Sequence, residues 1–188
     1  MKMPQLEPVL IPTKGLPLIE RAWALMTSVR KWRVTQDWEF TLYNGVVIKI
    51  PAGFEFDGAS IPKPIYMLAG AFLLLLFVGI EVSPLLMLIL SALFMLYGLL
   101  LSPVGIMLIA GLIHDYAYAN GHLLHADGTR YDYKNGCRLD YDDLFLKTNL
   151  QVNGVIYADH MAALLLKMFG GIAWEQHRQR RANQTPSN

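Results

Sequence analysis

The most prominent pattern along the chain is a long apolar run in its middle. Ile65–Ile80 carries no charged side chain, Glu81–Pro84 interrupts the run, and Leu85–Leu101 continues it. A membrane-spanning helix needs about 20 apolar residues, within a range of roughly 17–25, and each stretch reaches that range once its flanking residues are included. The pattern predicts a two-helix transmembrane hairpin over residues 65–102. A helical hairpin buried in a soluble core is the alternative.

Charge distribution suggests how this hairpin is oriented. Glu81 is the only formally charged residue between Ile65 and Ile113, whereas Lys and Arg residues occur on both sides of the run. Because cationic flanks stay on the cytoplasmic side, we expect both flanks in the cytoplasm and the Glu81 turn outside. A hairpin returns the chain to the side it left, so the two flanks can build one domain.

Before the apolar run, hydrophobic and polar residues tend to alternate along the chain. Trp38–Tyr43 and Val46–Ile50 are rich in aromatic and β-branched residues, and Asn44-Gly45 lies between them. This spacing predicts a β-hairpin with a type I′ turn, in which both central residues adopt positive φ. A third short strand is expected at Phe54–Phe56. The proline-rich residues 1–20 are expected to form an extended arm.

After the run, helical segments dominate. We expect helices over Val104–Ala119, Arg138–Gln151 and Val155–Phe169, with Gly170-Gly171 ending the last one. Residues 122–135 are expected to form a polar loop.

The predicted fold class is therefore α+β, a small antiparallel β-meander packed on about three helices and interrupted by the hairpin. The expected divisions are residues 1–64 for the arm and β-hairpin part of the domain, 65–102 for the membrane hairpin, 103–174 for the helical part of the same domain, and 175–188 for a basic flexible tail.

Composition agrees with a membrane protein and excludes some partners. The 188 residues are 54% hydrophobic and 16% charged, whereas a typical soluble domain has about 25% charged residues. The net charge of +1 gives no reason to expect a nucleic-acid partner. Cys137 is the single cysteine, so an internal disulfide is excluded.

His114-Asp115 is the first candidate for chemistry, because both residue types bind divalent metal ions. Neighbouring residues point roughly 100° apart on a helix, so the pair needs partners from elsewhere. Those partners are Asp57 and one of the carboxylates Asp140, Asp142 and Asp143. The alternative is that His114 and Asp115 hold the domain together through hydrogen bonds, and residue types alone favour that alternative.

Three other groups are weaker candidates. Ser60 could act as a nucleophile with His114 and Asp115, although it lacks the Gly-x-Ser-x-Gly elbow and suits a helix cap equally well. His122, His125 and Asp127 could bind metal or simply form a solvated loop. The arginines near the C-terminus could touch anionic lipid head groups.

Three segments together resemble a known family. Pro51–Pro62 reads PAGFEFDGASIP, Gly111–Tyr118 reads GLIHDYAY, and Asp142–Phe145 reads DDLF. Their order is similar to that of the phage and prophage family catalogued as domain of unknown function 1353, which also has a glycine near the end of its last helix, here Gly170 or Gly171. The family's polar positions correspond to Asp57, Ser60, His114, Asp115, Tyr118 and Asp142. The family mostly lacks an insertion such as residues 67–101.

The resemblance implies a phage or prophage origin and an α+β domain, and no definite activity. We therefore expect a membrane-anchored phage or prophage accessory protein in the host inner membrane, with its domain on the cytoplasmic side. Its expected partners are the lipid bilayer and other phage or host membrane proteins, in a lysis or host-membrane role. The alternative is a metal-dependent hydrolase in which Asp57, His114, Asp115 and Asp142 bind a divalent cation that activates water. Whether the chain is an enzyme stays open at this point.

Overall fold

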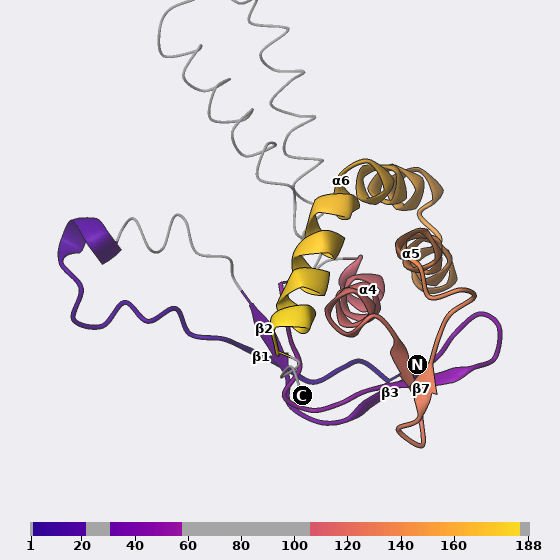
Figure 1. Ribbon diagram of the computed structural model, residues 1–188, viewed down its shortest axis with the longest axis horizontal. Coiled ribbons are helices and arrows are strands. Elements are labelled where there is room, and N and C mark those ends of the chain that lie inside the picture. Colours follow the sequence, from indigo (N-terminus) through magenta and orange to yellow (C-terminus); the bar gives the residue numbers. More distant parts are fainter. Residues whose placement is uncertain (1, 22–30, 58–105, 185–188) are drawn as a thin grey trace, which may run out of the picture.

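The computed structural model describes residues 2–21, 31–57 and 106–184. They form an α+β arrangement of two antiparallel sheets and the helices that pack on them (Figure 1). The predicted membrane hairpin over residues 65–102 lies outside the described residues, as does Ser60. No helix in the described ranges is both long enough and apolar enough to cross a membrane.

The larger sheet contains the β-hairpin predicted from the sequence. Strands β3 (Trp38–Thr41) and β4 (Val47–Ile50) pair antiparallel, with Trp38 opposite Ile50. The turn type was predicted wrongly: Gly45 has φ +83°, but Asn44 is not among the described residues with positive φ. The Gly45 amide donates to the Leu42 carbonyl at 2.9 Å, and the Leu42 amide donates to the Val46 carbonyl at 2.9 Å. The connection is therefore a three-residue loop whose last residue alone needs glycine.

The same sheet continues through residues that were expected to form a loop. Strands β6 (Leu123–His125) and β7 (Arg130–Tyr131) complete the order β3-β4-β6-β7. The His125 amide donates to the Thr129 carbonyl at 2.8 Å, and Gly128 adopts φ +85° in the turn. Leu123 is completely buried. These strands are too short, and carry too few apolar residues, for periodicity to have revealed them.

The smaller sheet includes the N-terminal arm. It has the order β1-β2-β5, with β1 at Leu6–Pro8, β2 at Trp32–Val34 and β5 at Glu55–Phe56. The strand expected at Phe54–Phe56 is thus present, but it pairs with β2 instead of extending the β3–β4 hairpin. Phe54, directly before β5, contacts α4: the centroids of the Phe54 and Tyr116 rings lie 4.9 Å apart in an edge-to-face arrangement.

Within residues 106–184, the helices are α4 (Leu108–Asn120), α5 (Arg138–Val152) and α6 (Ile156–Gln184). Gly121 ends α4 in a left-handed conformation with φ 75°, which confirms the predicted end. The predicted bounds of α5 are also close to those observed. Helix α4 lies at the centre, in contact with α5, α6 and the strands β5 and β6 (Figure 1).

The predicted end of α6 at Gly170-Gly171 was wrong, because the helix continues to Gln184. Its ribbon changes direction along its length (Figure 1), and a glycine pair is a common cause of such a bend. The second half of α6 is held to the domain by Trp174, whose ring contacts those of Tyr118 and Tyr141 at 5.0 and 6.0 Å. Residues 175–184 continue this helix, whereas a flexible tail was expected there.

Candidate functional site

The candidate site is centred on Asp142, a carboxylate of α5 with no solvent-exposed surface. Its Oδ1 accepts a hydrogen bond from the Tyr118 hydroxyl at 2.5 Å and lies 3.1 Å from Nε2 of His114. Its Oδ2 accepts from Nη1 of Arg138 at 3.0 Å. Burying a carboxylate is costly unless it is paired and hydrogen-bonded, and both oxygens of Asp142 have such partners.

Helical periodicity explains why the side chains of this cluster, two from α4 and two from α5, lie together. His114 and Tyr118 are four residues apart on α4, so they lie on one face of that helix. Arg138 and Asp142 have the same spacing on α5, where they form an ion pair. Burial and the neighbouring Asp142 raise the pKa of Tyr118, so its hydroxyl keeps its proton and acts as the donor.

Arg138 extends the network to α6. Besides Asp142, its Nη1 donates to the backbone carbonyls of Leu166 and Lys167, each at 3.3 Å. One guanidinium therefore joins α5 to α6 just before the glycine pair.

Gly170 allows α6 to approach this network closely. A Cβ atom at Gly170 would lie 2.8 Å from the Tyr118 hydroxyl and 3.5 Å from Nη1 of Arg138, whereas one at Gly171 would meet nothing within 4 Å. The Tyr118 hydroxyl is held by its bond to Asp142. Gly170 is therefore the member of the pair that the packing requires.

Asp115 lies at the edge of the network and is less well satisfied. Its Oδ1 is 3.7 Å from Nδ1 of His114, and its Oδ2 receives no hydrogen bond from a donor in the described part of the chain. Burial raises the pKa of the Asp115 carboxyl to about 7, with Asp57 adding to the shift and His114 opposing it. A carboxyl that titrates near neutral pH can serve as a general acid or base. Asp115 therefore has a carboxyl whose pKa suits proton transfer near neutral pH.

The pKa values of His114 and His177 are shifted in opposite directions. Burial disfavours the charged form of His114, but hydrogen bonds and charges from Asp115 and Asp142 outweigh it and leave its pKa raised. Burial, followed by the charge of Arg180, lowers the pKa of His177. Asp57 and His114 both act electrostatically on His177, so α6 brings this second histidine near the site. No pattern in the sequence indicates His177.

The residues predicted from the sequence are thus partly assembled. His114, Asp115 and Asp142 are brought together, and Asp57 lies within electrostatic range of Asp115. The other two acidic candidates are engaged elsewhere: Asp140 accepts from the Asn135 and Cys137 amides at the start of α5, and Asp143 pairs with Lys134 and Lys147. The Asp127 carboxylate accepts from the Thr129 amide in the β6–β7 turn.

Metal binding receives little support from this geometry. In residues 2–21, 31–57 and 106–184, no group of three His, Cys, Asp or Glu side chains is arranged to hold a metal ion. A metal ion at Asp142 would have to displace Arg138 or Tyr118, and one at His114 would have to replace one of its carboxylate partners. The metal and Ser60 hypotheses both remain predictions.

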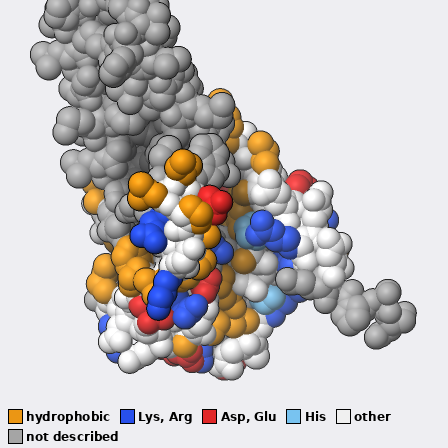
Figure 2. Space-filling model, turned by 90° about the vertical axis from the view of Figure 1, so that its left-hand side faces the viewer, with side chains coloured by type: hydrophobic (Ala, Val, Ile, Leu, Met, Phe, Trp, Pro, Cys, Tyr) orange, Lys and Arg blue, Asp and Glu red, His pale blue; other side chains and the backbone are white. Residues whose placement is uncertain are grey.

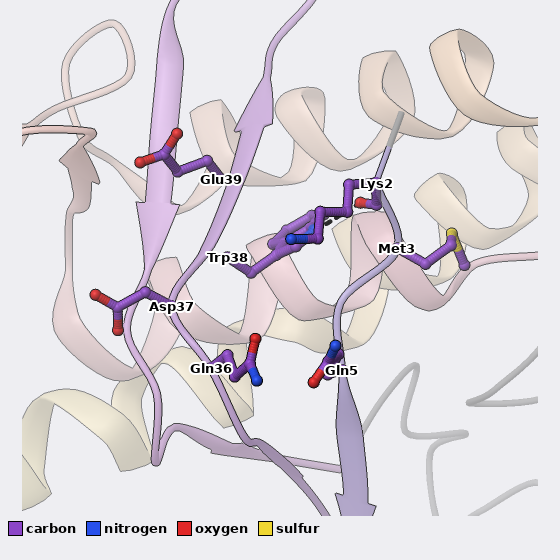
Figure 3. A pocket seen from close by; sticks show the side chains of 7 residues that line it. All are labelled: Lys2, Met3, Gln5, Gln36, Asp37, Trp38 and Glu39. Atoms are coloured by element: carbon purple, nitrogen blue, oxygen red, sulfur yellow. Dashed lines mark hydrogen bonds between the residues drawn. The ribbon is translucent and has the colours of Figure 1, made fainter.

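A cavity of about 330 Å³ lies on the other side of the domain, between the N-terminal arm and β3 (Figure 3). Lys2 lies against the ring of Trp38, whose Nε1 donates to the Lys2 carbonyl at 2.8 Å, and Gln5 faces Gln36 across the opening (Figure 3). The polar side chains around it are exposed. The cavity therefore offers no buried titratable group and is a weaker candidate than the Asp142 cluster.

Residues 32–73 match the model of a family described as Protein of unknown function (DUF1353). This match supports the family resemblance. It includes Asp57 and Ser60 and stops before α4, so the correspondence of His114, Asp115 and Asp142 rests on their motifs. No curated protein and no solved structure matches the chain.

Proposed function

We propose that the chain is a membrane-anchored accessory protein without catalytic activity, in which residues 65–102 form a helical hairpin that holds the α+β domain at the membrane. The observation that carries the proposal is the apolar run itself, in which Glu81 is the only charged residue over two stretches of near-spanning length. A charged side chain inside a bilayer costs free energy, which explains why the run has almost none. A soluble domain of this size gives no comparable reason for their absence.

The way both ends of the run join the domain supports an insertion. Before the run, Asp57 follows β5 and acts electrostatically on Asp115 in α4. After the run, Ile106 precedes α4 and packs against the buried cluster that includes Met107 of the α4 N-terminus and Ala158 of α6. Two spans return a chain to the side it left, which is what two ends in one domain require.

A structural role for Asp142, in place of a catalytic one, is proposed because of how it is bonded. Its three partners belong to the protein and satisfy both of its oxygens. A catalytic carboxylate would instead need an oxygen available to a substrate, a water molecule or a metal ion. No observation on the described residues favours the metal-dependent hydrolase.

The biological setting is proposed from the family resemblance. A phage or prophage protein anchored in the host inner membrane could act in lysis or in changing that membrane, with phage or host membrane proteins as partners. The proposed cytoplasmic side for the domain is supported by Lys and Arg in the flanks and by their absence from the Glu81 turn.

The membrane anchor is tested by alkaline extraction of membranes from cells that express the chain. The wild-type protein is expected to stay in the pellet until detergent is added. A Leu75→Arg/Leu88→Arg variant should move into the supernatant, because each charge at a span centre costs about 2.5–3.5 kcal/mol of insertion free energy. A Leu10→Arg/Leu18→Arg variant is the matched control, since these residues are exposed and outside the run. Wild-type protein found in the soluble fraction without detergent would refute the proposal.

A further inference from the structure

The first half of α6 has large apolar side chains on its outer face. Those of Tyr157, Met161, Leu164 and Met168 are 90%, 54%, 57% and 64% exposed, respectively. At about 100° per residue, these four positions fall within an arc of about 60°. We call this surface the α6 stripe.

The opposite face of this helix is also apolar. Ala158 and Ala162 face the domain and pack with Met107, Ala110 and Phe145. A surface helix normally presents polar residues outward and large apolar residues inward. Here the small side chains point inward and the large ones outward, so the first half of α6 requires a second apolar environment.

Charge on this part of the helix points to lipid as that environment. Between Ile156 and Trp174, the exposed ionisable side chains are His160 and Lys167, and the single acidic residue, Asp159, is buried. A surface that carries neutral and cationic groups around an apolar stripe suits anionic phospholipid. The mainly exposed Tyr157 at one end suits the membrane–water boundary, where tyrosine is enriched.

The position of the stripe relative to the apolar run agrees with this choice. Leu165 and Leu166 of α6 pack against the same buried cluster as Ile106, where the chain enters α4 after the run. The face of the molecule in Figure 2 shows exposed hydrophobic side chains together with Lys, Arg, Asp and Glu. A hairpin anchored over residues 65–102 would therefore leave the domain with the first half of α6 close to the bilayer.

We propose that the first half of α6 lies in the membrane–water interface, with the α6 stripe against the acyl chains of anionic phospholipid. Such interfacial helices bury their apolar face about 5–10 Å into the boundary region. The inference rests on the proposed membrane anchor and adds a second contact, which fixes the orientation of the domain on the bilayer.

The test uses the full chain with Cys137→Ser as background, reconstituted in nanodiscs that contain phosphatidylglycerol. Single cysteines replace Leu164 or Met168 in the stripe and Glu39 on β3 as an exposed control, and each carries a spin label. Collision rates with oxygen, which concentrates in lipid, and with a water-soluble nickel chelate report the environment of the label. The oxygen-to-nickel ratio is expected to be several-fold higher at Leu164 and Met168 than at Glu39.

Each alternative outcome has its own signature. If the chain remains in the nanodiscs but the stripe labels have the same ratio as Glu39, the α6 inference is wrong while the anchor stands. Stripe labels shielded from both reagents, with spin–spin broadening that disappears on dilution with unlabelled protein, would identify a second copy of the chain as the occupant and overturn the lipid contact. If the chain does not associate with nanodiscs, the anchor fails, and this inference fails with it.

Discussion

An Asp142→Ala substitution is expected to lower the free energy of unfolding by about 3–5 kcal/mol, the usual cost of removing one partner from a buried ion pair. The wild-type carboxylate receives hydrogen bonds from α4 and α5 and pairs with Arg138, which also binds the backbone of α6. Without Asp142, the buried His114 and Tyr118 lose their shared acceptor, and Arg138 loses its counter-charge. All three helices should therefore be loosened together.

Denaturant unfolding of the purified chain in mild detergent, followed by tryptophan fluorescence, measures this loss. Asp132→Ala is the matched control, because Asp132 is an exposed carboxylate paired with Arg130 on the surface, and its midpoint should hardly change. Asp142→Asn keeps the volume but loses the charge, so it should fall between wild type and Asp142→Ala. An Asp142→Ala protein as stable as the Asp132→Ala control would show that Asp142 does not hold the helices together.

A Gly170→Ala substitution is expected to make the protein less stable than Gly171→Ala by about 1–3 kcal/mol, the typical cost of overpacking. The added methyl group would lie 2.8 Å from the Tyr118 hydroxyl, which cannot move without lengthening its 2.5 Å bond to Asp142. Either Tyr118 must leave Asp142 or α6 must move away from α4.

Gly171→Ala is the matched control, because its added methyl group would meet nothing within 4 Å. Both variants replace glycine by alanine in one helix, so the gain in helix propensity of about 1 kcal/mol is common to them. Gly171→Ala alone should therefore raise the unfolding midpoint above that of wild type. Equal midpoints for the two variants would contradict the close contact at Gly170.

Much of the local structure could be predicted because it depends on short-range patterns. The β3–β4 strands follow from alternation, and α4 ends at Gly121, where a left-handed conformation favours glycine. The α+β class follows from the succession of these elements. The turn type was predicted wrongly because Asn-Gly favours type I′ only in a two-residue loop, and the loop here also includes Tyr43.

The remaining elements depend on tertiary contacts that no local pattern reveals. Strand β1 forms because the N-terminal arm pairs with β2, far along the chain. Helix α6 passes through two glycines because Trp174 packs on Tyr118 and Tyr141 beyond them. In isolation, Gly170-Gly171 favours a helix end, and packing against the domain overrides that preference.

For the candidate site, the residue types in the sequence indicated which polar side chains to consider. They did not indicate which of these side chains contact one another. His114, Asp115 and Asp142 were selected as polar residues near apolar helices, and the structure brings them together. The spacing of Arg138 and Asp142, like that of His114 and Tyr118, could have indicated that each pair shares a helix face. That these two faces meet at a single carboxylate depends on the packing of α4 against α5, as does the approach of His177.

The claim that the Asp142 carboxylate serves the fold, and not a metal centre, is tested most directly by the metal content of the purified full-length chain. Elemental analysis of wild type and His114→Ala, each after incubation with Mg²⁺, Mn²⁺ or Zn²⁺ and desalting, compares the bound metal per chain. We predict no stoichiometric metal in either protein, because Arg138, Tyr118 and His114 already occupy both oxygens of Asp142. About one metal ion per wild-type chain, lost in His114→Ala, would contradict the claim and favour the metal-dependent hydrolase.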